Sequence, residues 1–234
     1  MGTLYIVATP IGNLQDITFR ALKILNDVDF IVCEDTRKTG NLLNLTSEMI
    51  QKTKSEKPQL ISYYEENEMR RIPEIIKVLE MNLNVALVSD AGTPAISDPG
   101  FKLIRECIKK GIRVESIPGA SSVISSLVSS GLPTDKFMFL GFLPKKQGHR
   151  LKLLKDIEKT SEYISQTIII FESPFRLTKT LEEIQSVFSN IEVVVTRELT
   201  KIHEEIKRGN ILDILSYFKS KKVKGEIVIL FNLK

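Results

Sequence analysis

The chain has 234 residues, of which 42% are hydrophobic and 26% are charged, and its formal net charge at pH 7 is +4. This length suits one large or two small domains, and the composition is that of a globular protein rather than a disordered or fibrous one. The charge is compatible with an RNA partner but does not indicate one by itself, since many proteins that never bind nucleic acid are equally basic.

Neither membrane insertion nor metal binding is indicated by the sequence. No apolar run reaches the roughly 18 residues of a membrane span, and residues 4–8 are too short and lack the basic lead of a signal peptide. We therefore expect a cytoplasmic protein with no membrane contact. Cys33 and Cys107 belong to no CxxC pair, so we expect both to be buried and unreactive. His149 and His203 are expected at the surface or in packing, and we expect no metal.

In the first half of the chain, short apolar runs alternate with segments of helical period. We predict strands at residues 4–8, 30–33 and 85–88 and one ending near 117, with helices over residues 19–25, 72–79 and about 104–108. Such alternating βαβ units predict an open, mainly parallel sheet that is covered by helices.

The second half is predicted to be another α/β layer structure. Small residues run from Pro118-Gly119 to Ser130, and residues 131–135 form a turn, so we place the boundary here, with domains 1–117 and 118–234. We predict strands near residues 137–142, 167–171, 192–196 and 226–231, and helices near 150–159, 177–188 and 211–218.

The most unusual segment is residues 89–100, SDAGTPAISDPG, which directly follows a predicted buried strand. Two glycines and two prolines predict a rigid loop whose main chain can approach a ligand closely. In open α/β sheets, ligands bind beyond the carboxyl ends of the strands, where this loop falls. The alternative is a tight strand-to-helix turn in which Asp98 caps the next helix. The residues alone leave both interpretations open.

Other predicted strands also end in polar segments, at residues 9–16, 34–37, 171–176 and 197–201. Residues 34–37 set two carboxylates beside a guanidinium, for which a solvated helix cap is the alternative. If the two halves face each other, these segments line one cleft. The phosphate-loop, GxGxxG and Gly-x-Ser-x-Gly patterns are missing, which disfavours a nucleoside triphosphatase, a Rossmann dehydrogenase and a serine hydrolase.

Seven motifs occur in a characteristic order. They are GTLYIVATPIGNL at residues 2–14, EDTR at 34–37, SDAGTP at 89–94, PGA at 118–120, GFLP at 141–144, FES at 171–173 and RELTK at 197–201. In this order they resemble the tetrapyrrole methylase superfamily, most closely its members that methylate a ribose 2′-hydroxyl in small-subunit ribosomal RNA. The resemblance runs from Gly2 to the end of the sequence.

The resemblance implies a two-domain α/β fold of the tetrapyrrole methylase type, class III of the S-adenosylmethionine-dependent methyltransferases, usually a homodimer without a metal. It places S-adenosyl-L-methionine in the cleft between the domains. The cofactor contacts implied are Ile11, Asp90, Ala91, Gly92, Thr93, Ile96, Ser121, Ser122, Glu172 and Leu199. The implied partner is the small ribosomal subunit, through 16S rRNA, and the implied reaction methylates the 2′-oxygen of a cytidine in its decoding region.

Four residues are our candidates for catalysis, namely Glu34, Asp35, Arg37 and Glu68. Because a ribose hydroxyl is a poor nucleophile, a carboxylate that accepts its proton or a cation that steadies the alkoxide would add roughly a hundredfold or more to the rate. A purely structural ion-pair cluster is the alternative, and the motif fixes the position of these residues but not their role.

The sequence departs from the family pattern in two places. Many relatives have histidines where Tyr64 and Glu66 stand, so a histidine base is not essential here. Longer relatives carry an additional small helical domain beyond the point where this sequence ends. Residues 145–150, Lys152 and Lys155, and also residues 219–224, could contact RNA phosphates instead. A lysine-rich solvated surface is the alternative for both segments.

Two rival functions remain at this point. The first is a methyltransferase that acts on carbon atoms of a tetrapyrrole, although the loop at residues 9–13 has less glycine than is typical of those enzymes. The second is a non-catalytic ribosome assembly or RNA-binding factor, which predicts spoiled cofactor loops, whereas residues 90–94 and 118–122 are intact. A methyltransferase acting on RNA is therefore the leading interpretation.

Overall fold

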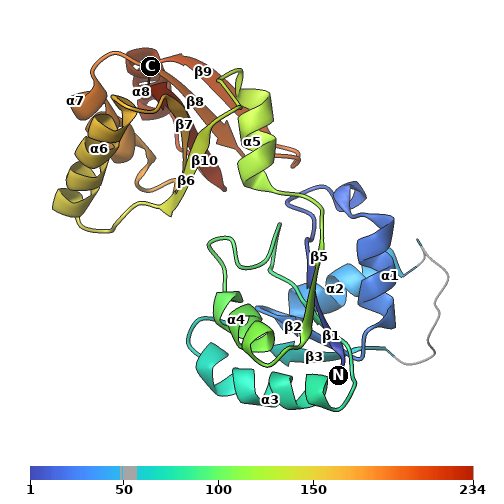
Figure 1. Cartoon of the computed structure of the whole chain (residues 1–234). Coiled ribbons are helices and arrows are strands. Elements are labelled where there is room, and N and C mark those ends of the chain that lie inside the picture. The colour runs from blue at the N-terminus through green and yellow to red at the C-terminus, as the bar shows by residue number, and fades with distance from the viewer. Residues whose placement is uncertain (48, 50–56, 234) are drawn as a thin grey trace. The chain divides into compact units, whose positions relative to one another are not determined.

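The computed structural model describes residues 1–47, 49 and 57–233. It divides the chain into two compact units, Met1–Ser121 and Ser122–Lys234, which we call the first and the second unit (Figure 1). Domain limits at 1–117 and 118–234 stay a prediction. Within the described residues, no helix is long and apolar enough to cross a membrane.

The first unit contains a five-stranded sheet in which every pairing is parallel. Its strands are β1 (Thr3–Val7), β2 (Phe30–Cys33), β3 (Gln59–Ser62), β4 (Val85–Leu87) and β5 (Arg113–Ile117), in the order β3-β2-β4-β1-β5. Central strands such as β4 are buried on both faces, which explains their unbroken apolar runs. The predicted α/β fold with a parallel sheet is confirmed.

Helices cover both faces of this sheet (Figure 1). The helices α1 (Phe19–Asp27) and α2 (Thr36–Thr46) pack on one face, and α3 (Glu68–Glu80) and α4 (Phe101–Lys109) pack on the other. A short 3-10 turn, η1 (Leu14–Asp16), precedes α1. Gly100 occupies the position that caps α4, so Asp98 is not the N-cap residue of that helix.

The second unit contains a mixed five-stranded sheet. Its strands are β6 (Phe137–Phe142), β7 (Gln166–Glu172), β8 (Glu192–Arg197), β9 (Glu205–Asn210) and β10 (Ile227–Leu233), in the order β6-β7-β10-β8-β9. Only the pairing of β6 with β7 is parallel, and the other three pairings are antiparallel.

One helix packs on one face of the second sheet and three helices pack on the other. The single helix is α5 (Ser122–Ser130), and the three are α6 (Gln147–Ser161), α7 (Leu177–Phe188) and α8 (Ile211–Lys219). The sequence predicted only a small-residue segment where α5 lies, because serine is a weak helix former. Val123 and Leu127 stabilise this helix by packing into an apolar cluster with the strands below.

Candidate active site

At the carboxyl ends of β1 and β4, the chain leaves the first sheet toward opposite edges. After β1 the chain crosses through α1 on one face to β2, whereas after β4 it crosses through α4 on the other face to β5. β1 and β4 are neighbours in the sheet. Open α/β sheets bind ligands at such points, because the two following loops diverge there.

A pair of main-chain hydrogen bonds joins the loops that follow these two strands. The N–H of Thr9 donates to the carbonyl of Gly92 at 2.9 Å, and the N–H of Gly92 donates to the carbonyl of Thr9 at 3.0 Å. The buried hydroxyl of Thr9 also donates to the carbonyl of Ser89 at 3.2 Å. The two loops are therefore fixed to each other without any charged group.

Gly92 is required at this junction for two reasons. Its φ of +81° lies in the left-handed region, and a Cβ at this position would lie 3.2 Å from Cγ2 of Ile11. The next residue, Thr93, donates its hydroxyl to the carbonyl of Ala120 at 3.2 Å, which brings in the segment after β5. Three of the predicted cofactor residues, Ile11, Gly92 and Thr93, thus lie at one place where three loops meet.

The rest of the loop after β4 holds an unusual backbone conformation. Ala95 and Ser97 have φ values of 66° and 64°, which are costly for residues with a Cβ and which cluster at functional sites in proteins. Ile96, which stands between them, leaves 44% of its surface exposed. The packing of this loop therefore presents an apolar side chain to solvent where the sequence predicts a cofactor contact.

Glu34 faces the same loop from the end of β2. Its carboxylate accepts a hydrogen bond from the main chain of Asp90. Burial raises the pKa of Glu34, and the negative charges of Asp98 and Asp90 raise it further. The side chain of Asp90 itself pairs with Lys38 at 2.5 Å. The structure thus brings Glu34, Asp90 and Lys38 together in the first unit.

Asp35 and Arg37 form a separate, solvent-facing pair at the start of α2. Asp35 caps this helix and accepts from the N–H of Arg37 at 2.9 Å, and it also accepts from Nη2 of Arg37 at 2.7 Å. These hydrogen bonds hold the pKa of Asp35 well below its usual range. The helix-cap alternative thus describes Asp35, which is a poor proton acceptor as a result.

Glu68 begins α3 and is buried among partners of its own. It accepts a hydrogen bond from the hydroxyl of Tyr63 at 3.2 Å and forms an ion pair with Lys102. Burial raises the pKa of Tyr63, and the charge of Glu68 raises it further. The contacts that fix Glu68 therefore come from other residues than those that fix Glu34.

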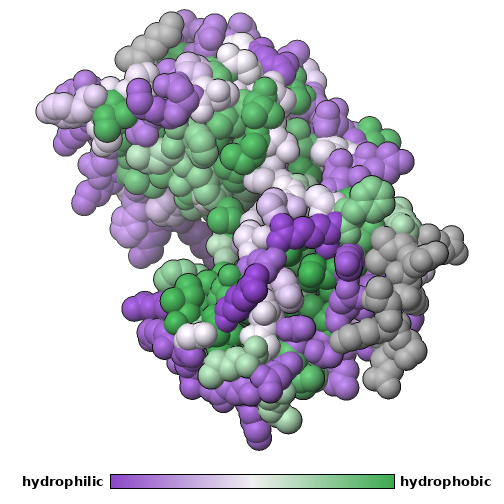
Figure 2. Space-filling view, turned by 45° about the vertical axis from the view of Figure 1, so that its right-hand side comes forward, coloured by the Kyte–Doolittle hydropathy of each residue, from purple (hydrophilic) through white to green (hydrophobic). Residues whose placement is uncertain are grey.

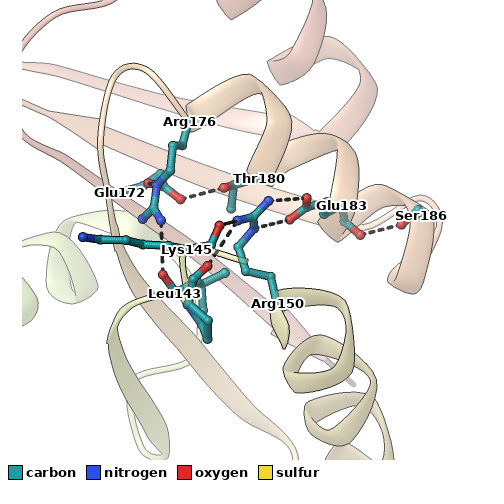
Figure 3. Close-up of polar contacts among 9 residues, drawn as sticks. Leu143, Lys145, Arg150, Glu172, Arg176, Thr180, Glu183 and Ser186 are labelled. Carbon is teal, nitrogen blue, oxygen red and sulfur yellow. Dashed lines mark hydrogen bonds and ion pairs between the residues drawn. The ribbon is translucent and has the colours of Figure 1, made fainter. Parts of the chain in front are cut away.

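The other predicted cofactor residues lie at the ends of strands or helices, in a turn, or at the boundary between the two units. Glu172 ends β7, and its carboxylate accepts from Arg176 Nε at 2.8 Å and from the hydroxyl of Thr180 at 2.6 Å (Figure 3). Leu199 is buried in a turn whose neighbours Glu198 and Thr200 both have positive φ. Ser121 ends the first unit and Ser122 begins α5. Their roles in cofactor binding stay predictions.

Sequence reasoning did not select Thr9 or Lys38 as site residues. The bond of Thr9 to Gly92 spans 83 residues of sequence, and the ion pair of Lys38 with Asp90 spans 52. No local pattern signals either contact, because each depends on which strands are neighbours in the sheet.

A groove between α3 and α4 in the first unit has a volume of about 580 Å³. Met69, Ile76, Phe101 and Arg105 are among the residues that line it, and none of the predicted site residues does. Among the described residues, no three His, Cys, Asp or Glu side chains are arranged to hold a metal ion.

Residues 3–215 match the family of tetrapyrrole (corrin/porphyrin) methylases. The match starts at β1 and ends inside α8, so it covers both units and every predicted site residue.

Three relatives align with this chain over 98% or more of its length. The chain is 46% identical over 234 residues to the ribosomal RNA small subunit methyltransferase I of Thermotoga maritima, and the alignment covers all of both chains. It is 48% identical over 230 residues to the protein of the same name from a Hydrogenobaculum species, covering 98% of this chain and 95% of the relative. A third protein of that name, from Halalkalibacterium halodurans, is 43% identical, and the alignment covers 75% of its length.

Solved structures share the fold at low sequence identity. A cobalt precorrin-4 methyltransferase of cobalamin biosynthesis superposes with a TM-score of 0.68 at 20% identity, covering 98% of this chain and 94% of that one. A uroporphyrin-III C-methyltransferase from Thermus thermophilus, complexed with S-adenosylhomocysteine, gives a TM-score of 0.65 at 16% identity and covers 98% and 97%.

Proposed function

This chain belongs to the tetrapyrrole methylase family, and we propose that it is an enzyme that transfers a methyl group from S-adenosylmethionine to the ribose 2′-oxygen of a cytidine in 16S ribosomal RNA. The observation that carries this proposal is the full-length identity of 46% to the Thermotoga maritima relative. The solved cobalt precorrin-4 and uroporphyrin-III methyltransferases are only 20% and 16% identical to this chain, which favours RNA over a tetrapyrrole as substrate.

The loops of the first unit fit a nucleoside cofactor. Residues 91–93 and 119–121 have no side chain larger than threonine, and the hydrogen bond from Thr93 to Ala120 keeps these two segments together. The main chain is therefore open to close approach by a ligand. We propose that Ile11, Asp90, Ala91, Gly92, Thr93 and Ile96 hold S-adenosylmethionine, together with Ser121, Ser122, Glu172 and Leu199. When bound, this cofactor supplies an electrophilic methyl group on a sulfonium.

Glu34 is the best of the four candidates for accepting the proton of the 2′-hydroxyl. A general base works best when its pKa lies closer to the working pH, and burial and two neighbouring carboxylates raise the pKa of Glu34. Asp35 is the opposite case, because its pKa is lowered by Arg37. We assign Asp35, Arg37 and Glu68 to positioning, since their hydrogen bonds fix the starts of α2 and α3.

Two further features belong to the proposal. We propose a homodimer, as the resemblance implies, which sedimentation of the purified protein tests by its mass. We also propose that the protein acts in the cytoplasm on the small ribosomal subunit, because 16S rRNA is its proposed substrate.

The experiment that tests the proposal offers labelled S-adenosylmethionine with two acceptors, small ribosomal subunits that lack the modification and a uroporphyrinogen-type tetrapyrrole. We expect label in RNA at a bond that resists alkaline hydrolysis, which marks a methylated 2′-oxygen. A Gly92→Arg variant should bind no cofactor and transfer no label. Label in the tetrapyrrole alone would identify the chain as a tetrapyrrole C-methyltransferase. Cofactor binding without transfer to either acceptor would contradict methylation of both RNA and tetrapyrrole.

A further inference from the structure

Two loops of the second unit are tied together by buried ion pairs. Arg150 binds both carboxylate oxygens of Glu183 at 2.7 Å, and its Nη1 donates to the carbonyls of Pro144 at 3.1 Å and Lys145 at 2.7 Å. Arg150 and Glu183 are each less than a tenth exposed. The prediction that Arg150 contacts phosphate is therefore wrong, because its guanidinium is used to hold the loop after β6.

A second arginine holds the same loop from the turn after β7. Arg176, which pairs with Glu172, donates through Nη1 to the carbonyl of Leu143 at 3.2 Å (Figure 3). Three consecutive carbonyls, those of Leu143, Pro144 and Lys145, are thus bound by two guanidiniums. The loop after β6 and the turn after β7 are therefore fixed side by side.

Exposed lysines occur on this fixed loop and on the first turns of α6, which follows it. Figure 3 shows the side chain of Lys145 extending away from the buried pairs. Lys145, Lys146, Lys152 and Lys155 are all exposed, and no acidic residue occurs from 145 to 155. Within the described part of the chain, no salt bridge involves any of these four lysines, whereas Lys102, Lys110 and Lys219 each pair with a glutamate. The segment therefore concentrates uncompensated positive charge.

Exposed aromatic rings flank the same loops. Phe175 leaves 96% of its surface exposed and directly precedes Arg176, and Phe142 leaves 57% exposed and directly precedes Leu143. Figure 2 shows that the visible surface mixes hydrophobic patches, in green, with hydrophilic ones, in purple. A phenyl ring that is almost wholly exposed makes little contact inside the fold and is therefore available to contact a partner.

We infer that Phe142, Lys145, Lys146 and Phe175 form a surface that binds the single-stranded RNA substrate, with Arg150 and Arg176 as positioning residues. Lysines that follow a phosphate backbone and aromatic rings that stack on bases are the two devices by which proteins bind unpaired RNA. This inference rests on the proposed function for the identity of the RNA, but the binding of single-stranded RNA can be measured without catalysis.

The lysine part of the surface is tested by the salt dependence of binding. Anisotropy of a labelled cytidine-rich 12-nucleotide RNA measures Kd for the full chain between 50 and 200 mM salt. A Lys145→Ala/Lys146→Ala variant should bind at least about tenfold more weakly and lose about 1.4 from the slope of log K against log salt, or about 0.7 for each lost phosphate contact. A matched Lys23→Ala/Lys77→Ala variant removes two exposed lysines of the first unit, outside both segments that the sequence predicts to contact phosphate. Equal losses in both variants would overturn the inference, because only overall charge would then matter.

The aromatic part is tested by Phe175→Ala, with Tyr163→Ala as the control. Tyr163 is also an aromatic residue with 86% of its surface exposed, so neither substitution removes packing inside the fold. Phe175→Ala should weaken RNA binding about tenfold with an unchanged salt slope, since stacking carries no charge. Unchanged RNA affinity together with a changed sedimentation mass would overturn the inference and identify Phe175 as a contact between two copies of the chain.

Methyl transfer to small subunits separates this inference from the proposed function. In the lysine variant, KM for the subunit should rise about tenfold, while kcat and the affinity for S-adenosylmethionine stay unchanged. Normal KM in that variant would overturn the inference and leave the proposed function intact. If the unsubstituted chain transfers no methyl group to subunits, the proposed function fails, and the anisotropy measurements alone decide whether the surface binds RNA.

Discussion

The loops after β1 and β4 in the first unit are joined to each other by main-chain hydrogen bonds, whereas the loops after β6 and β7 in the second unit are joined through arginines that form ion pairs. Thr9 and Gly92 exchange two N–H to carbonyl bonds, and no charge takes part. Arg150 and Glu183, in contrast, are ionised groups that share two short hydrogen bonds away from water. The uncharged junction of Thr9 with Gly92 leaves the main chain of the first unit open to a ligand. In the second unit, the ion pair of Arg150 with Glu183 fixes the loop that carries Lys145 and Lys146.

The comparison predicts that the second unit is the more sensitive to loss of a single charge. Arg150→Met leaves Glu183 buried without its partner and should lower the free energy of unfolding by about 3–5 kcal/mol, as measured by urea denaturation. The double variant Arg150→Met/Glu183→Met removes both charges and should recover most of that loss. A single variant within 1 kcal/mol of the original protein would show that the pair does not hold the loop.

The first unit should instead be sensitive in its chemistry. Glu34→Gln should lower kcat by about a hundredfold or more with little change in stability, because it removes the proposed proton acceptor. Asp35→Ala removes a helix cap and should cost about 1 kcal/mol of stability with a much smaller fall in kcat. The reverse pattern would assign the proton transfer to Asp35.

The pH dependence of kcat/KM sharpens the assignment of Glu34. Activity should rise with pH as Glu34 loses its proton, and this limb reports the raised pKa of the free enzyme. Asp98→Asn removes a negative charge that raises the pKa, so the limb should move to lower pH. A limb that does not move would point to another group as the base.

A pair of glycine variants tests the neutral junction itself. Gly92 and Gly111 both have positive φ, but a Cβ at Gly92 meets Ile11, whereas one at Gly111 meets nothing within 4 Å. Both alanine variants should lose about 1 kcal/mol of stability through backbone strain. Only Gly92→Ala should weaken S-adenosylmethionine binding, because only its Cβ meets a proposed cofactor residue. We expect a loss of affinity of about tenfold, or about 1.4 kcal/mol, by calorimetry. Equal affinity in the two variants would remove Gly92 from the cofactor site.

The smallest expected effect concerns a charged cluster on β9. Burial raises the pKa of Glu205, but Lys221, Tyr217 and Arg197 outweigh it and lower the pKa to about 2. Because this value lies below the ordinary 4.5, the stabilisation is full above pH 4.5 and is lost as the pH falls toward 2. Glu205→Gln should lower Tm by about 2–4 °C at pH 7, equivalent to about 1 kcal/mol, and by less near pH 2. A pH-independent difference in Tm would contradict this account.

Strands buried on both faces were predictable from the sequence, whereas two of the four edge strands were not. β1, β2 and β4 read as unbroken apolar runs because helices cover both faces of the first sheet. β3 and β9 were missed, since each lies at an edge of its sheet and carries polar residues on partly exposed positions. Helix α2 was missed as well, because its sequence TRKTGNLLNLT has weak apolar periodicity.

The candidate site was likewise predictable only in part. The loops after β1 and β4 were found from their glycines, prolines and place at the ends of strands. Their direct junction through Thr9 was not predictable, because it depends on the order of strands in the sheet. The sequence predicted that Arg150 contacts phosphate, but Arg150 is buried and bound to Glu183. This contact was not predictable either, since Glu183 lies on another helix.

The central claim is that the junction beyond β1 and β4 holds the cofactor. Ultraviolet cross-linking of labelled S-adenosylmethionine to the full chain, followed by peptide mapping, tests it directly. The account predicts label in peptides that contain residues 9–13, 89–100 or 118–122. Label confined to residues 69–80 and 101–110, which line the groove between α3 and α4, would contradict it.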